Sequence, residues 1–167
     1  GTVVDSIRNN STAAGSQLIG IATANAAATF TSNTVRNLTA SGGTGTANAA
    51  SAIGMLLTAV SNGHTLQQNS IVNLKNTNGS AATTVTGIQF SGSAGTNLIA
   101  RNRIQVLSVA SGTGVINGIA VAAGTATYQN NMIALGNGLT ASALVQGVNE
   151  AGGTNVFHHN SVYIGGS

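Results

Sequence analysis

Few side chains in this sequence could carry acid–base chemistry. The carboxylates are Asp5 and Glu150, and the histidines are His64, His158 and His159. Cleavage of a polysaccharide generally needs a pair of carboxylates or an acid-bound metal ion. Asp5 and Glu150 lie near opposite ends of the chain, so a fold built of stacked repeats would hold them far apart. We therefore expect no catalytic residues and no enzymatic activity.

The adjacent histidines His158 and His159 are the part of the sequence that most resembles a metal site. Adjacent residues on a strand point to opposite faces, so this pair would chelate one ion poorly. The chain has no Cys, and His64 is remote in the sequence. Zinc sites usually combine three or four Cys, His or acidic ligands, and that set is missing here. We expect no metal site and no cofactor.

The composition restricts the class of partner. Charged residues make up 4% of the chain, where about 25% is typical. Nucleic-acid-binding proteins concentrate Lys and Arg on one face, but here only Arg101 and Arg103 lie close together. No apolar run reaches the ~18 residues of a membrane span. We expect neither a nucleic-acid partner nor a membrane span. The absence of Pro and a hydrophobic content of 42% also argue against disorder.

A sequence motif recurs about every thirty residues, and the fold that it predicts must position the acidic and histidine side chains described above. An apolar residue is followed after two spacers by Asn, and one spacer later by an aliphatic residue. Successive copies lie 28 to 36 residues apart, and Asp5 takes the Asn position in a degenerate first copy. The Asn column is Asp5, Asn33, Asn69, Asn102, Asn131 and Asn160. The apolar columns are Phe30, Leu66, Ile99, Tyr128 and Phe157 before it, and Ile7, Val35, Ile71, Ile104, Ile133 and Val162 after it.

This period predicts an all-β fold, a right-handed parallel β-helix (solenoid) of about five full rungs plus the start of a sixth. The apolar runs are short and rich in Val, Ile and Thr, as strands are. Equivalent positions in successive rungs would stack about 4.8 Å apart. The columns would then bury apolar area that one repeat could not bury alone. The right-handed sense follows from the strong preference of parallel crossovers.

The Asn column requires a break in the strand. The apolar residues three before and two after each Asn have opposite parity, so a regular strand cannot place both inside. We expect a bend at or beside the Asn, which tolerates left-handed backbone, and a ladder of stacked amides. A second recurring residue is Gly, where we expect another bend for the same backbone reason. These glycines are Gly20, Gly54, Gly87, Gly118 and Gly147.

The repeats resemble those of a known group of proteins. Asn-Thr-Val-Arg-Asn-Leu at 33–38, Asn-Ser-Ile-Val-Asn-Leu at 69–74 and Thr-Gly-Ile at 86–88 look like the β-helix repeats of large secreted surface proteins of the Bacteroidetes. The resemblance covers essentially the whole chain. It implies export by the type IX route, an extracellular or bacterial cell-surface location, and an adhesin-like role. The similarity to pectate-lyase-like enzymes is of fold only, because their acid clusters have no counterpart here.

These observations lead to a structural interpretation. We expect residues 1–167 to form a single β-helix segment of a longer repeat protein, acting as a non-catalytic structural or adhesive segment of a secreted bacterial cell-surface protein. Val162, Tyr163 and Ile164 would leave an open strand edge, which pairs readily with another chain. The expected partners are neighbouring repeats or identical subunits stacked end to end, with surface glycans as a further partner.

Two alternatives remain open at this point. The first is a carbohydrate-binding β-helix module related in fold to polysaccharide lyases. Its contacts would come from His158 or from Tyr163, which lies one residue beyond an apolar column and should face outward. The second is a subunit of a head-to-tail extracellular filament.

Overall fold

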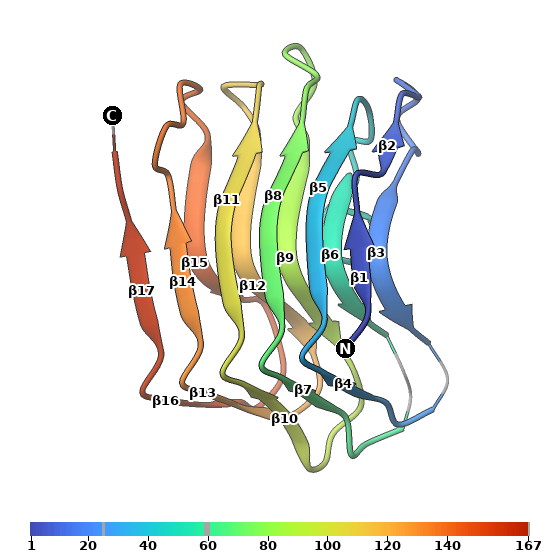
Figure 1. Ribbon diagram of the computed structural model, residues 1–167, viewed down its shortest axis with the longest axis vertical. Coiled ribbons are helices and arrows are strands. Elements are labelled where there is room, and N and C mark those ends of the chain that lie inside the picture. The colour runs from blue at the N-terminus through green and yellow to red at the C-terminus, as the bar shows by residue number, and fades with distance from the viewer. Residues whose placement is uncertain (25, 59–60, 167) are drawn as a thin grey trace.

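The computed structural model is an all-β right-handed parallel β-helix (Figure 1). The structure describes residues 1–24, 26–58 and 61–166. Strands of successive repeats lie side by side along one axis, from the blue N-terminal side to the red C-terminal side of Figure 1. The chain completes five rungs and begins a sixth. The predicted fold class is therefore confirmed.

Three parallel sheets form the faces of the helix, and each rung contributes to them in the order A, B, C. Sheet A consists of β1 (Val3–Asp5), β2 (Arg8–Asn9), β5 (Thr34–Ala40), β8 (Ser70–Asn76), β11 (Arg103–Val109), β14 (Met132–Leu135) and β17 (Ser161–Ile164). Sheet B consists of β3 (Leu18–Thr23), β6 (Ala52–Leu57), β9 (Thr84–Ser91), β12 (Val115–Ala123) and β15 (Leu144–Glu150). Sheet C consists of β4 (Thr29–Thr31), β7 (Thr65–Gln67), β10 (Asn97–Ala100), β13 (Ala126–Gln129) and β16 (Val156–His158). A short 3₁₀ turn, η1 (Ala47–Ala49), lies between β5 and β6.

The apolar columns lie in the core as continuous files of registered partners. On sheet C the file is Phe30, Leu66, Ile99, Tyr128 and Phe157. On sheet A it is Val35, Ile71, Ile104, Ile133 and Val162. On sheet B it is Ile21, Met55, Ile88, Ile119 and Val148. Members in the middle rungs are almost completely buried, so each residue packs against its equivalents one rung above and one rung below.

The prediction that Asp5 belongs to the Asn column is wrong. Asp5 is the registered partner of Arg36, three residues beyond Asn33. The residue beside Asn33 is Thr2, whose backbone N–H donates to Asn33 Oδ1 at 2.7 Å. The first repeat is thus displaced by three residues from the register that the Asp5-Ser6-Ile7 phrase suggested. The displacement places Asp5 against the cationic side chain of Arg36.

The place predicted for Ile7 in the sheet A column is wrong for the same reason. Val4, not Ile7, is the registered partner of Val35, and Val4 packs against the main core cluster. Ile7 lies further along the strand, where its carbonyl accepts the N–H of Thr39, and its side chain is exposed. Val4 is partly buried and Ile7 is exposed, as the pairing of β1 with β5 requires.

Each Asn of the remaining column follows a bend. The residue immediately before it has a left-handed backbone, with φ between 52° and 58° at Ser32, Gln68, Arg101, Asn130 and His159. This bend returns the apolar residues on both sides of the Asn to the interior. The preceding residue, rather than the Asn itself, therefore adopts the left-handed conformation.

The recurring glycines do not bend the chain in the predicted way. None of the five has a positive φ. At Gly54, an added Cβ would lie 2.6 Å from the carbonyl oxygen of Gly87 and 2.7 Å from Cγ2 of Ile71. Sheets A and B thus approach so closely here that only Gly fits. On β6, Ala52 and Met55 both face the core although they lie three residues apart. A regular strand places every second residue on one face, so the alternation of inward and outward residues shifts by one position at the glycine.

Candidate functional site

The Asn column forms a hydrogen-bonded ladder through the molecule. It consists of Asn33, Asn69, Asn102, Asn131 and Asn160, here called the asparagine ladder. From Asn69 onward, each Oδ1 accepts two bonds from the preceding Asn, one from its backbone N–H and one from its Nδ2, at 2.9 to 3.1 Å. From Asn69 onward, each Nδ2 also donates to a carbonyl of the preceding rung. The ladder joins all rungs at one corner and leaves its buried amides satisfied.

The ladder stops at the C-terminal end of the stack. The last strand of each sheet lies there, β15, β16 and β17, and these three strands are here called the C-terminal rung. Asn160 accepts from Asn131 and donates to the carbonyl of Tyr128. Within residues 1–24, 26–58 and 61–166, no side chain takes the next place in the file and accepts the backbone N–H of Asn160. The end of the ladder is therefore a hydrogen-bonding edge with the geometry of one further rung.

The apolar columns are exposed at the same end. Val162 is 47% exposed, whereas its registered neighbour Ile133 is 2% exposed. Phe157 is 37% exposed, although it stacks on the fully buried Tyr128 with ring centroids 4.7 Å apart. Ile164 is also exposed. Within each column the side chains are of the same kind. The difference in exposed fraction therefore arises from their place in the last strand of the stack.

Asp5 lies at the opposite end of the stack. Its Oδ2 lies 2.7 Å from the guanidinium of Arg36, and its Oδ1 accepts bonds from Asn37 Nδ2 and Ser6 Oγ, both at 2.8 Å. The hydrogen bonds from Asn37, Ser6 and Arg36 lower the pKa of this carboxyl from 3.8 to about 2. Asp5 thus ties β1 to β5 as a structural anion.

The second carboxylate cannot act together with Asp5. Glu150 lies at the end of β15, four rungs away, and its Oε1 accepts a 2.6 Å bond from Asn155 Nδ2. Four strand spacings correspond to roughly 19 Å along the axis. That separation is too long for a pair of carboxylates flanking one glycosidic bond.

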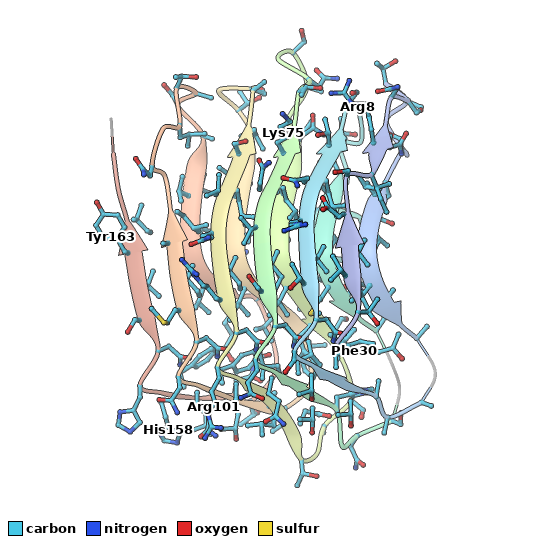
Figure 2. All side chains as sticks on the ribbon, viewed as in Figure 1. Arg8, Phe30, Lys75, Arg101, His158 and Tyr163 are labelled. Atoms are coloured by element: carbon cyan, nitrogen blue, oxygen red, sulfur yellow. The ribbon has the colours of Figure 1, made fainter. Side chains whose placement is uncertain are left out.

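His158, His159 and Tyr163 do not form a common site. The rings of His158 and His159 are 6.2 Å apart, and no group of three His, Cys, Asp or Glu that could hold a metal occurs in the described part of the chain. Tyr163 faces outward and is 65% exposed. Figure 2 shows Tyr163 on sheet A and His158 at the corner of sheet C, well apart. A shallow hollow of about 220 Å³ borders Tyr163, with Met132 and Arg103 in its lining.

Tyr128 is a titratable residue buried in the apolar core. It packs edge-on against Phe90, and its hydroxyl has no hydrogen-bond partner among the described residues. Burial, with a smaller contribution from the charge of Glu150, raises the pKa of this phenol well above its ordinary value. Tyr128 therefore acts as a large core side chain.

Sequence reasoning missed a second polar file, five residues before the asparagine ladder. The backbone N–H of His64 donates to Asn97 Oδ1 at 3.0 Å, and His64 Nδ1 accepts the N–H of Ala28. Further along, the N–H of Ala126 donates to Asn155 Oδ1 at 3.0 Å. The available signal was weak, because this offset carries a polar residue in three copies, His64, Asn97 and Asn155, and an Ala in the other two. His64 is fully buried and has a structural role in this file.

Neither the arrangement of these residues nor similarity to other proteins assigns a reaction to the chain. No helix in the described residues is long and apolar enough to cross a membrane. The features that stand out are the asparagine ladder and the apolar columns, which run from rung to rung through the molecule. Comparison with family models, with curated protein sequences and with solved structures finds no match to this chain.

Proposed function

We propose that this β-helix is a non-catalytic structural segment of a secreted bacterial cell-surface protein, with an adhesin-like role of the kind its repeats resemble. The observation that carries the proposal is the stack itself, in which the apolar columns and the asparagine ladder give successive rungs the same contacts. Each rung is therefore complementary to another rung of the same fold. The molecule would then provide length and a rigid display surface, with chemistry supplied elsewhere.

The partner of the open rung is another β-helical rung. Phe157 and Val162 present the side chains that their equivalents present to the next rung throughout the interior. An Asn placed beyond Asn160 would accept its backbone N–H, as Asn160 accepts that of Asn131. Exposed strand edges with this combination pair readily with a further strand. Low charge at this end favours such contact, because no like-charge repulsion opposes it.

The partner rung could come from a neighbouring repeat of the same chain or from an identical subunit. In the second case, the C-terminal rung of one subunit would contact β1, β3 and β4 of the next. Val4, the inward-facing residue of β1, is only partly buried, so that edge is also available. Such a contact joins two different surfaces and does not close, so it would produce a filament.

Hydrogen exchange at β17 tests the proposal in both forms. We expect the amides of Val162 and Ile164, which alternate with the hydrogen-bonded amides of Ser161 and Gly165 and so point away from β14, to exchange rapidly in the dilute segment. The same amides should become protected either in the parent protein or at high segment concentration. Protection in the parent protein alone identifies a neighbouring repeat, and sedimentation showing concentration-dependent assembly identifies identical subunits. If β17 stays unprotected in both preparations, the open rung has no partner of this kind and the proposal fails.

Two substitutions make the test specific. Val162→Arg places a charge in the column that the partner would bury, and it should abolish the protection or assembly. Tyr163→Arg, one residue along the same strand, places the same charge on the outward face and should leave assembly intact. Equal effects of both variants would contradict stacking through the apolar columns.

The cell-surface location has its own test. Antibodies raised against the segment should label intact cells of the producing bacterium, and protease added outside the cells should remove the label. Labelling only after lysis would contradict the location without affecting the stacking proposal.

A further inference from the structure

We propose that a hollow on the outer face of sheet B binds an uncharged sugar unit. This face lies on the side of the helix behind sheet A in Figure 1. The hollow has a volume of about 300 Å³ and is lined by residues of β9, β12, β15 and the segment at η1. It is distinct from the open C-terminal rung, so the inference goes beyond the structural role proposed above.

The segment between β5 and β6 creates one wall of the hollow. It folds back so that η1 lies against the outward face of β9 and β12. Ala50 packs there with Ile53 and Leu56, two outward residues of β6, in a small apolar cluster separate from the main core. Thr46 and Ala47 then border the hollow beside these strands. An ordinary solvent-facing sheet becomes a recess because this segment stands over it.

The floor consists of two rows of outward-facing residues. One row continues from Ile53 and the other from Leu56, through the registered partners on β9, β12 and β15. Their order along the stack follows from the strand pairing. The rows are Thr86, Asn117 and Gln146, and Gln89, Ala120 and Asn149. Four carboxamide side chains thus converge on the hollow, those of Gln89, Asn117, Gln146 and Asn149.

Two of these carboxamides are buried with unused hydrogen-bonding capacity. Gln89 and Asn117 are 0% and 5% exposed, and the oxygens Gln89 Oε1 and Asn117 Oδ1 have no partner among the described residues. Thr86 Oγ1, on the same face, is also without a partner there. Buried polar groups are usually hydrogen-bonded, and leaving them unpaired is costly. A cluster of such groups at one recess is the sign of a site that a polar ligand completes.

The lining determines the chemical class of the ligand. None of the residues that line the hollow is charged, so a charged ligand would lose its hydration without gaining an ion pair. Carboxamides offer both a donor and an acceptor, which match the adjacent hydroxyl groups of a sugar ring. Ala120, Val115 and Leu144 provide apolar contact beside them, suitable for the C–H groups of the ring. A volume of this size corresponds to the lower end of small-ligand pockets.

Titration of the segment with simple sugars tests this site. Glucose, galactose, N-acetylglucosamine and maltose are added at millimolar concentrations, with glucuronate as the charged counterpart of glucose. We expect saturable changes in the amide resonances of Ala47, Ala120 and Asn149 with at least one neutral sugar, and weaker binding of glucuronate. Absence of saturable changes with all four neutral sugars overturns the proposal, as does equal binding of glucuronate and glucose.

Variants locate the binding. Gln146→Ala removes a half-exposed carboxamide of the floor and should weaken binding about 3- to 10-fold, the range expected for one lost hydrogen bond. Asn149→Ala serves as a second variant if the thermal unfolding of Gln146→Ala shows that it is not folded. Gln129→Ala, an outward Gln on sheet C, is the matched control and should leave binding unchanged. Loss of binding in Tyr163→Ala but not in Gln146→Ala would place the sugar at the sheet A hollow and contradict the assignment.

Discussion

At the scale of single residues, the left-handed positions show where the sequence fits its backbone well and where it does not. Asn37, Asn73 and Val106 occupy equivalent positions on β5, β8 and β11, each with φ near 57°. Asn73 Nδ2 donates to Asn37 Oδ1 at 2.7 Å. Val106 has a β-branched side chain, for which this conformation is unfavourable, and its side chain is half exposed. The third position thus carries strain that the first two avoid.

Replacing Val106 by Asn should stabilise the protein. The substitution relieves the left-handed strain and extends the Asn37–Asn73 pair by one member, so we expect a gain of about 1 kcal/mol in the free energy of unfolding. Urea denaturation measures the gain. Val106→Thr is the matched control, because it adds a polar group while keeping the β-branch. If Val106→Thr stabilises as much as Val106→Asn, backbone strain is not the cause.

The pKa of Asp5 predicts an acid-sensitive N-terminal strand. Because the folded-state pKa is lowered from 3.8 to about 2, the ionised form favours the folded state. The contribution is fully present above about pH 4 and is lost as the pH falls toward 2. Amide exchange of β1, relative to that of β8, should accelerate over this range. Asp5→Asn should remove most of this difference in pH dependence; an unchanged profile would show that another group anchors β1.

At the scale of the elements, the close approach of sheets A and B depends on the recurring glycines of sheet B, here called the glycine file. They are Gly20, Gly54, Gly87, Gly118 and Gly147. At Gly87 an added Cβ would lie 2.6 Å from the carbonyl oxygen of Gly118 and 2.6 Å from Cγ2 of Ile104. The carbonyl belongs to the neighbouring strand β12 of sheet B, and the methyl group belongs to a buried side chain on β11 of sheet A, so an added Cβ would force both apart. The glycine file therefore sets the distance between the two sheets.

Gly87→Ala should destabilise the protein by about 1 to 3 kcal/mol, the range for overpacking of a well-filled core. Chemical denaturation gives the change. The control is Gly79→Ala, in an exposed loop where an added Cβ would meet nothing within 4 Å, and it should be nearly neutral. Comparable losses in both variants would contradict the close-packing explanation.

The predictable and unpredictable elements differ in their physical origin. The apolar columns could be predicted because residues such as Tyr128 and Ile133 have an apolar equivalent in each neighbouring repeat. Stacking of the repeats then buries these equivalent positions together. The first rung could not, because Asp5-Ser6-Ile7 imitates Asn69-Ser70-Ile71 and only pairing with β5 distinguishes the registers. The hollow on sheet B depends on how the segment before β6 folds over outward residues, which no local pattern encodes.

At the scale of the whole molecule, the asparagine ladder links the rungs into one unit. Asn102 is central: it accepts two bonds from Asn69 and donates to Asn131 and to the carbonyl of Leu66. Asn102→Ala should cost about 3 kcal/mol in the free energy of unfolding, because it leaves buried donors and acceptors unpaired. Asn137→Ala, in an exposed turn, is the control and should change stability little. A loss below about 0.5 kcal/mol for Asn102→Ala would mean that the ladder contributes little to cohesion.

The stacked ladder itself can be observed by NMR couplings across hydrogen bonds. A long-range correlation from the backbone nitrogen of one ladder Asn to the side-chain carbonyl carbon of the next reports each rung contact directly. We predict four such correlations, joining Asn33 to Asn69, Asn69 to Asn102, Asn102 to Asn131 and Asn131 to Asn160. If these correlations are missing, or if they join residues of other rungs, the asparagines do not stack in this order and the β-helix described here is wrong.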